Sequence, residues 1–419
     1  MIRRLFAIPL LALAALSVSA DGRTPTPDEI CEAAPSTKVV SIRFEGLRKT
    51  RESVLRRAIS FELGDTWSEE SREQMRRELR SLGLFDRVEI SETVTRPEEG
   101  EIELVVSLRE RWTLVPIPFF TSTSSGSSGG LFVLENNLLG FNKQLIAGGA
   151  YGTAGFNGIF IYNDPSISGT DIIGGTALTV GRAEQEAVDL DGESIATWES
   201  LTSTASLRLG YRISRELDVT TSLSYRADEF SPGLAPPGAS EVEAELFNAV
   251  SLSWSRVDPL RFFNAGPRGE IEGEYQLTGE IFEERSLRFS LDHDFPLFDG
   301  HRLGYALTAE ESIRSIWRAT SLGGRPTQRT LERGSLPAER YLTGGLSYEI
   351  PVYRPDWGTI TLLSFYEGGL IDEVGSYHGP GGGFRIYVSR VTLPAVGFDY
   401  AYRVANEQWL FSFSVGMGM

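Results

Sequence analysis

Apolar and polar side chains alternate along most of the chain after residue 113. The alternation is clearest in four segments, 205–213, 219–225, 271–277 and 303–309, where apolar residues favour every second position. A period of two over about ten residues is typical of a membrane-spanning β strand with a wet barrel interior. A soluble β sandwich has the same period with its apolar side turned inward, so the period alone leaves both architectures open.

The lengths of the connections between these strands favour the membrane barrel. Short links occur at 138–141, 214–216 and 298–300, and long polar links occur at 183–200, 228–243, 316–340 and 371–379. Short turns at one end and long loops at the other are the pattern of outer-membrane barrels, which have an even number of strands. We therefore predict an all-β transmembrane barrel of about 16 antiparallel strands over residues 113–419.

Residues 37–112 have a different pattern, which predicts one small α+β domain. Apolar residues alternate over 39–44, two helical patterns follow Thr50 and Ser68, and two further strands are predicted at 87–90 and 102–108. Thr50 and Ser68 are residue types that cap helix N-termini, and we expect each to cap the helix after it. The predicted order is strand, helix, helix, strand, strand.

The first residues have the pattern of a secretory signal peptide. Arg3 and Arg4 precede an apolar run that ends at Leu16, and small residues follow at 18–20. We predict a signal peptide over 1–20 and a linker over 21–36. The rest of the chain has no run of about 18 apolar residues, so a closed barrel is the membrane-spanning structure to expect.

Composition and charge exclude several classes of function. The net charge of -17 argues against a nucleic-acid partner, because a polyphosphate binds a basic surface. Three histidines and one cysteine exclude most His- or Cys-ligated metal sites, and we expect no metal and no cofactor. The segment 126–130 fits the Gly-x-Ser-x-Gly pattern of serine hydrolases, but strand-like residues follow it where that motif needs a helix. We predict that the protein is not an enzyme.

The α+β segment resembles a POTRA domain, the periplasmic module of outer-membrane assembly factors. The segments that carry this resemblance are 42–46, 63–65, 83–88 and 105–111, the third of which reads Gly-Leu-Phe-Asp-Arg-Val. A POTRA domain implies an exposed sheet edge, to which an extended peptide can add by main-chain hydrogen bonds. The predicted client-binding edge comprises Arg87, Val88, Glu89 and Ile90.

The barrel segment resembles the BamA/TamA-type family, also called bacterial surface antigens. The turn 137–140 (Asn-Leu-Leu-Gly), the pair Gly323 and Gly324 with Arg329, and the strand 365–369 (Phe-Tyr-Glu-Gly-Gly) carry this resemblance. It implies that the long loop folds into the lumen and that Arg329 contacts an acid, here Glu367. Family members usually place Gly and an aromatic residue after this arginine, and an aspartate at the position of the acid. This chain has Thr330, Leu331 and Glu367 instead.

The end of the chain resembles the terminal strand of the same family. Trp409, Phe411, Phe413 and Met419 share one parity. The family strand ends in phenylalanine, so Met419 departs from that pattern. In the family reading, the last strand meets the first at a barrel seam.

These observations together predict an outer-membrane protein whose POTRA domain lies in the periplasm. The expected function is to help insert or translocate polypeptides, with the POTRA edge capturing clients and the barrel seam templating or passing them. The expected partners are outer-membrane lipids, unfolded outer-membrane or secreted polypeptides, and periplasmic accessory proteins that bind the POTRA domain. The alternative is a passive or structural barrel that keeps its POTRA domain as a docking site.

Overall fold

The computed structural model describes most of the chain after residue 37. The described ranges are 38–96, 98, 100–123, 126–153, 155–189, 193–236, 238–260, 262–279, 283–323, 327–331, 336–372, 374–388 and 394–416. The predicted signal peptide and linker, together with Gly324 and Met419, lie outside these ranges.

Residues 38–110 fold into a mixed sheet with two helices. Their elements are β1 (Lys38–Glu45), α1 (Glu52–Ala58), α2 (Glu69–Ser81), β2 (Phe85–Arg96) and β3 (Glu101–Glu110). β3 is the central strand, with β1 parallel and β2 antiparallel to it. Both helices contribute to a core in which Leu55, Leu79 and Leu104 are fully buried. β1 and β2 are therefore the two edges of this sheet.

Of the two predicted helix caps, the structure has the cap of α2 but not that of α1. Ser68 caps α2, because its side chain accepts a hydrogen bond from the Ser71 N–H. The residue that precedes α1 is Arg51, which makes no side-chain capping bond, so the prediction of Thr50 as a cap is wrong. The Thr50 hydroxyl instead accepts a hydrogen bond from the amide of Asn137 in the barrel, at 2.8 Å. The Thr50 hydroxyl, which the sequence pattern assigned to the start of α1, therefore makes a contact with the barrel instead.

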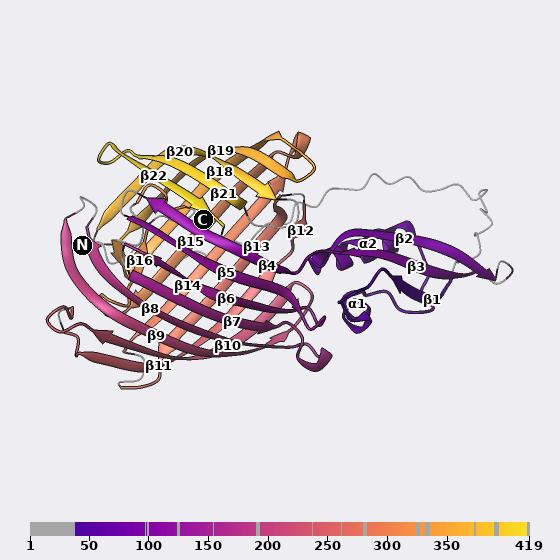
Figure 1. Ribbon diagram of the computed structural model, residues 1–419, viewed down its shortest axis with the longest axis horizontal. Coiled ribbons are helices and arrows are strands. Elements are labelled where there is room, and N and C mark those ends of the chain that lie inside the picture. Colours follow the sequence, from indigo (N-terminus) through magenta and orange to yellow (C-terminus); the bar gives the residue numbers. More distant parts are fainter. Residues whose placement is uncertain are drawn as a thin grey trace, which may run out of the picture.

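The rest of the chain forms a closed antiparallel barrel with sixteen long strands among the described residues (Figure 1). In chain order these are β4 (Leu114–Thr123), β5 (Gly126–Leu138), β6 (Lys143–Gly152), β7 (Gly155–Asp164), β8 (Ile172–Val188), β9 (Ser194–Arg212), β10 (Leu217–Phe230), β11 (Val242–Ser255), β13 (Asn264–Gln276), β14 (Arg285–Pro296), β15 (Arg302–Ile313), β18 (Arg340–Tyr353), β19 (Gly358–Ile371), β20 (Gly375–Val388), β21 (Pro394–Arg403) and β22 (Gln408–Val415). Short strands β12 (Asp258–Pro259), β16 (Thr320–Leu322) and β17 (Leu336–Ala338) lie in the connections, with single 3-10 turns at Ile167–Gly169 and Phe298–Gly300. The prediction of about sixteen strands is confirmed.

The outer face of the barrel is apolar. Leu207, Leu209 and Tyr211 on β9 and Leu287 on β14 are all more than half exposed. Because β strands alternate, the opposite residues of the same strands face the lumen, where charged side chains pair with one another. No helix in the described part of the chain is long and apolar enough to cross a membrane.

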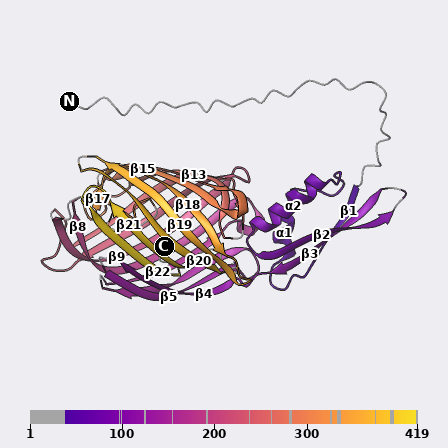
Figure 2. The same cartoon turned by 90° about the horizontal axis from the view of Figure 1, so that it is seen from above.

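The POTRA-like domain lies beyond one mouth of the barrel, at the end with the short turns (Figures 1 and 2). The segment before α1 contacts the β5–β6 turn: the Arg51 N–H donates to the Gly140 carbonyl at 2.9 Å. Lys49 forms an ion pair with the buried Glu135 of β5 at 2.6 Å. Gly140 has a φ of +81°, and a Cβ there would lie 2.1 Å from the Lys49 carbonyl oxygen. This close approach explains why a glycine ends the Asn-Leu-Leu-Gly turn.

We predict that acid weakens the segment which contacts this turn. Glu110 accepts hydrogen bonds from the backbone N–H groups of Lys49 and Thr50. Burial raises the pKa of Glu110, but these bonds and one from the Thr50 side chain outweigh burial and lower it. A carboxylate with a lowered folded-state pKa stabilises the fold above its unfolded pKa, and this contribution is lost as pH falls through the folded value. The loss should begin below about pH 4.5 and amount to roughly 1 kcal/mol for this partly exposed group.

The measurement is urea unfolding of the domain in the full chain, followed by tryptophan fluorescence at pH 7 and pH 3. Glu110→Gln should remove part of the stability at pH 7 and flatten its pH dependence. Glu89→Gln, which changes an exposed carboxylate on β2, is the control. Equal pH dependence in the wild type and Glu110→Gln would contradict the assignment.

Candidate functional site: the barrel seam and the lumenal loop

The barrel closes where β22 meets β4, and this seam is short. Among the described residues its register contains four residue pairs, from Ser412–Thr123 to Val415–Phe120. Any other two neighbouring long strands share at least seven residue pairs within the described residues. The next smallest number, seven, joins β20 and β21. Backbone pairing is what closes a barrel in lipid, and within the described chain the seam is the joint with the fewest residue pairs.

The predicted seam residues face outward on β22. Trp409 and Phe411 are 55% and 43% exposed. Trp409 stacks on Tyr400 of β21, with ring centroids 4.6 Å apart. The ring centroids of Phe413 and Phe120 lie 6.2 Å apart across the seam. These aromatic side chains form the lipid-facing surface of the seam, and its closure depends on the few backbone pairs behind them.

The β15–β18 connection enters the lumen and packs against the inner wall. Its short strands β16 and β17 pair with each other. One buried apolar cluster joins the connection to β18, β19 and β20 and comprises Leu322, Leu331, Leu336, Ala338, Tyr341, Ile371 and Tyr377. The Tyr377 hydroxyl donates to the Thr327 carbonyl at 3.1 Å. The loop is therefore fixed to the wall by packing as well as by polar contacts.

The structure brings Arg329 and Glu367 together inside the barrel. The Arg329 guanidinium lies 3.4 Å from a Glu367 oxygen, and the other oxygen accepts the Thr330 N–H at 2.9 Å. Glu367 is almost fully buried, and the guanidinium stacks 4.3 Å above the Phe365 ring. Gly323, at the start of this turn, donates its N–H to the Gln328 side chain at 3.0 Å. A buried carboxylate with both oxygens engaged holds the loop at one point.

A second acid, which the sequence reasoning missed, shares the same arginine. Asp399 of β21 lies 3.4 Å from the Arg329 Nε and receives two 2.8 Å hydrogen bonds from Arg385 of β20. Lumenal charges are numerous in this sequence, and no local pattern distinguishes this pair from the others. Arg329 thus connects the loop to β19 and β21, and β21 is the neighbour of the seam strand β22.

The two departures from the family pattern are buried in this arrangement. Thr330 is fully buried, and its methyl group lies 3.2 Å from where a Cβ would sit on Gly379. Leu331 joins the apolar cluster of the loop. Threonine and leucine therefore pack at positions where the family usually has glycine and an aromatic side chain.

A second arginine, also missed from the sequence, anchors the other end of the loop. Arg318 is 6% exposed and contacts Asp228 of β10, Glu245 of β11 and Glu284 beside β14 at 3.5, 2.7 and 3.3 Å. The neighbouring Trp317 packs edge-on against Phe230. Arg318 and Arg329 attach to different groups of strands, so the loop crosses the lumen between two anchored points.

The predicted client edge of the POTRA-like domain lies on β2. Val88 is buried against the helices, Ile90 is partly buried, and Arg87 and Glu89 are exposed and form an ion pair at 2.6 Å. In the described chain no strand pairs with the side of β2 that faces away from β3. The main-chain groups on that side are those of a free sheet edge.

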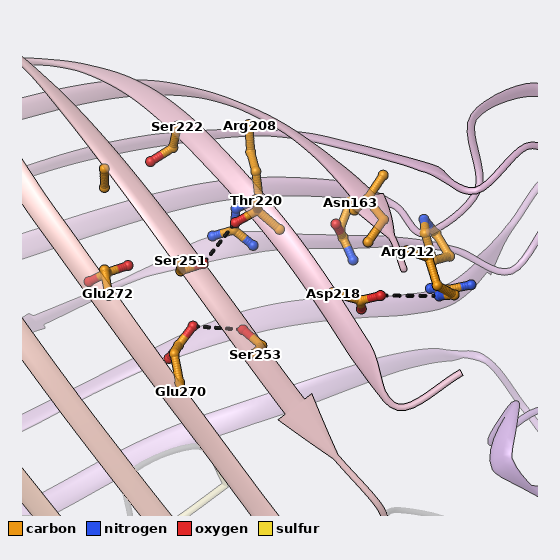
Figure 3. A pocket seen from close by; sticks show the side chains of 13 residues that line it. Asn163, Arg208, Arg212, Asp218, Thr220, Ser222, Ser251, Ser253, Glu270 and Glu272 are labelled. Carbon is orange, nitrogen blue, oxygen red and sulfur yellow. Dashed lines mark hydrogen bonds and ion pairs between the residues drawn. The ribbon is translucent and has the colours of Figure 1, made fainter. Parts of the chain in front are cut away.

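The lumen also contains a polar cavity of about 230 Å³ between β9, β10, β11 and β13 (Figure 3). Arg212 pairs with Asp218 there, and Ser253 donates to Glu270. Charges of both signs line this cavity, and within the described residues no group of acidic, histidine or cysteine side chains has the arrangement of a metal site. The mixed lining gives no preference for one class of small ligand.

Comparison with known proteins agrees with this architecture. Residues 37–111 match the POTRA family model, "Surface antigen variable number repeat". The fold is similar to BamA from Haemophilus ducreyi lacking POTRA domains 1–3, with 16% identity, 92% of this chain and 85% of that chain covered, and a TM-score of 0.59. It is similar to CdiB from Acinetobacter baumannii (13% identity, 91% and 74% covered, TM-score 0.63) and from Escherichia coli (14%, 91% and 76%, TM-score 0.65). No curated protein matches the chain by sequence.

The chain therefore combines one POTRA domain, which the family model matches over residues 37–111, with a closed β barrel of sixteen long strands among the described residues. This is the fold of the BamA and CdiB structures. The POTRA domain lies at the mouth with the short turns, and the loop between β15 and β18 enters the lumen from the opposite mouth.

We predict that Glu367→Ala or Arg329→Ala frees the loop while the barrel still assembles. Removing one partner leaves the other buried without its counter-charge, which costs about 3–5 kcal/mol in a dry site and less where water enters. Limited proteolysis of intact outer membranes should then cut the β15–β18 loop faster than in the wild type. Slower migration of boiled than of unheated protein in SDS gels would show that the barrel has assembled.

Arg340→Ala is the matched control, because Arg340 pairs with Asp372 at an exposed site at the same end of the barrel. This change should leave protease access unchanged. If the Arg329 and Glu367 variants are cut no faster than the control, the contact does not hold the loop.

Proposed function

We propose that this protein helps polypeptides to enter or cross the outer membrane. The observation that carries the proposal is the seam between β4 and β22, which has four residue pairs in the described chain where the other joints have at least seven. We propose that this joint opens at the lowest cost, and opening exposes two strand edges to an incoming segment. A barrel that only conducted solutes would gain nothing from such a joint.

The POTRA domain supports this function by its free edge and its attachment. An extended client can add to β2 along Arg87–Ile90 through main-chain hydrogen bonds. The domain is attached at the β5–β6 turn, two strands from the seam, so a captured segment is close to β4. Periplasmic accessory proteins are proposed to bind the same domain.

The lumenal loop supports the proposal from inside the barrel. Arg329 ties the loop to Glu367 on β19 and Asp399 on β21, which braces the wall beside the seam. The loop also crosses the lumen to Arg318 and its acids, which weighs against the alternative of a wide passive pore. We propose that the loop keeps the barrel in shape while the seam opens.

A reversible lock at the seam tests the function. Thr121 and Ser414 are paired across the seam and both face the lumen, so Thr121→Cys with Ser414→Cys should form a disulfide. In a Cys31→Ser background, this variant should replace the depleted wild-type protein only under reducing conditions. Depletion itself should lower the levels of particular outer-membrane or secreted proteins, and the oxidised variant should fail to restore them.

The matched control places a disulfide between strands that do not form the seam. Thr220 of β10 and Ser251 of β11 face each other with hydroxyl oxygens 2.9 Å apart, so Thr220→Cys with Ser251→Cys should also cross-link. This variant should restore client levels whether oxidised or reduced. If the oxidised seam variant restores them equally well, the seam does not need to open. If depletion changes only the permeability to small solutes, the protein is a passive barrel.

A further inference from the structure

The hairpin formed by β11 and β13 continues beyond the barrel wall at the mouth with the short turns. β11 pairs with β13 as far as Ser255, and β12 resumes this pairing in the same register from Asp258. Between the two segments, the Arg256 N–H donates to the Pro267 carbonyl at 3.0 Å. Among the described residues β12 pairs with β13 alone. The end of the hairpin is therefore attached to the barrel only through its own two strands.

Phe262, at the tip of this hairpin, packs against a distant part of the barrel wall. Its ring centroid lies 5.1 Å from that of Tyr387 on β20, and Phe262 is only 5% exposed. In the sheet, β14, β15, β18 and β19 separate β13 from β20. Because four strands intervene along the wall, the two rings meet across the opening of the barrel. The tip therefore occupies part of this mouth.

The burial of Phe262 is specific to this hairpin. Phe298, in the turn between β14 and β15 at the same mouth, is 68% exposed. Turns usually carry polar residues or glycine, yet this tip has two adjacent phenylalanines, Phe262 and Phe263, with ring centroids 4.9 Å apart. An apolar tip is stable here because it has an aromatic partner on β20.

A glycine permits the bend that brings the tip to this partner. Gly266 has a φ of +118°, and a Cβ there would lie 2.1 Å from the Arg256 carbonyl oxygen. A residue with a side chain would clash with the opposite strand in this conformation. The hairpin therefore turns inward where it leaves the wall, directly after the last pairs of β11 with β13.

Tyr387 presents a fixed surface to the tip. Its hydroxyl donates to Glu349 of β18 at 2.9 Å, and Arg302 of β15 pairs with the same carboxylate at 2.9 Å. Glu349 is 1% exposed and Tyr387 is 8% exposed. Because its far end is fixed by these polar groups, the tyrosine ring is a rigid apolar face for Phe262.

The POTRA domain contacts the hairpin from outside the barrel. Helix α2 lies against β12 (Figure 1). Arg215, in the β9–β10 turn, pairs with Glu78 of α2 and donates to the Ala58 carbonyl at 3.4 Å. On the inner side, the polar cavity begins next to the bend, because its lining residues Ser253 and Glu270 are paired on β11 and β13. The hairpin therefore lies between α2 and the lumen.

We infer that the tip of the β11–β13 hairpin is a gate at the mouth with the short turns, and that packing of Phe262 on Tyr387 keeps it closed. Opening requires the loss of one aromatic contact and a movement of the hairpin about its bend, while the long strands stay paired. A large solute that enters the lumen between β13 and β20 must displace the tip. This inference concerns access to the lumen and goes beyond the proposed function, since it does not require the seam to open.

Labelling of a lumenal cysteine tests the gate. Ser253→Cys, in a Cys31→Ser background, places a thiol in the polar cavity next to the bend (Figure 3). The label is a bulky polyethylene-glycol maleimide. It is added to isolated outer membranes, where it reaches both mouths, or to intact cells, where it reaches only the outer face. The labelling rate of the full-length protein is divided by that of the heat-denatured protein, which corrects for the reactivity of the thiol.

Phe262→Ala should raise the labelling rate in isolated membranes about ten-fold, because truncating a buried phenylalanine costs more than a ten-fold change in an equilibrium requires. The rate in intact cells should not change, because the tip lies at the other mouth. Phe298→Ala, which truncates an exposed phenylalanine at the same mouth, is the matched control and should change neither rate. Tyr387→Phe keeps the ring and should also change neither, whereas Tyr387→Ala should act like Phe262→Ala.

The inference is overturned if a Phe262→Ala barrel that has assembled, as shown by slower migration after boiling, is labelled at the wild-type rate in isolated membranes. An equal rise in intact cells would also overturn it, because the label would then enter through the opposite mouth. If Phe262→Ala does not assemble, Phe262→Leu, which removes the ring and keeps an apolar side chain, decides by the same comparison. A seam that stays closed would refute the proposed function and leave the gate standing.

Discussion

The structure depends on one constraint: in lipid, each backbone N–H and C=O of a strand must find its partner on a neighbouring strand. Closing the sheet into a barrel meets this constraint around fifteen of the sixteen joints with seven or more residue pairs among the described residues. The joint between β4 and β22 meets it with four among the same residues. The same rule that makes the barrel stable therefore also identifies the joint at which we propose that it opens.

The buried charges of the lumen join strands beside this seam and make no contact across it that the described residues show. Arg329 contacts acids on β19 and β21, and Arg385 ties Asp399 to β20, so three consecutive strands beside the seam are held by one ionic network. Such a network gains little net stability, because desolvation offsets most of the Coulomb attraction, but it is costly to break from one side. It fixes the geometry of the three strands that lie beside the joint which we propose opens.

The sequence predicted the architecture because period and connection length are local signals that the membrane enforces everywhere. The pairing of Arg329 with Glu367 followed from a family resemblance and not from the residues alone. Arg318 and the Arg385–Asp399 pair were missed, because one sequence cannot distinguish a lumenal charge that meets a loop from one that meets water. Thr50 was misassigned as a helix cap because its hydroxyl is used by Asn137, 87 residues away. Local rules fail where a tertiary partner competes for the same group.

The effect of Pro116 and Pro118 on the barrel depends on which neighbouring strand each of them faces, and the register of β4 with β5 shows this. In sequence they merely weaken the prediction of a strand, since proline removes a ladder hydrogen bond. In the barrel, the Asn136 N–H of β5 donates to the Thr113 carbonyl, so odd-numbered residues of this segment face β5 and both prolines face the other side of β4. The missing donors therefore remove no bond from the β4–β5 ladder, in which ten residue pairs join the two strands. Proline is tolerated here because it lies on the side of β4 that faces the seam, where the described residues pair only from Phe120 to Thr123.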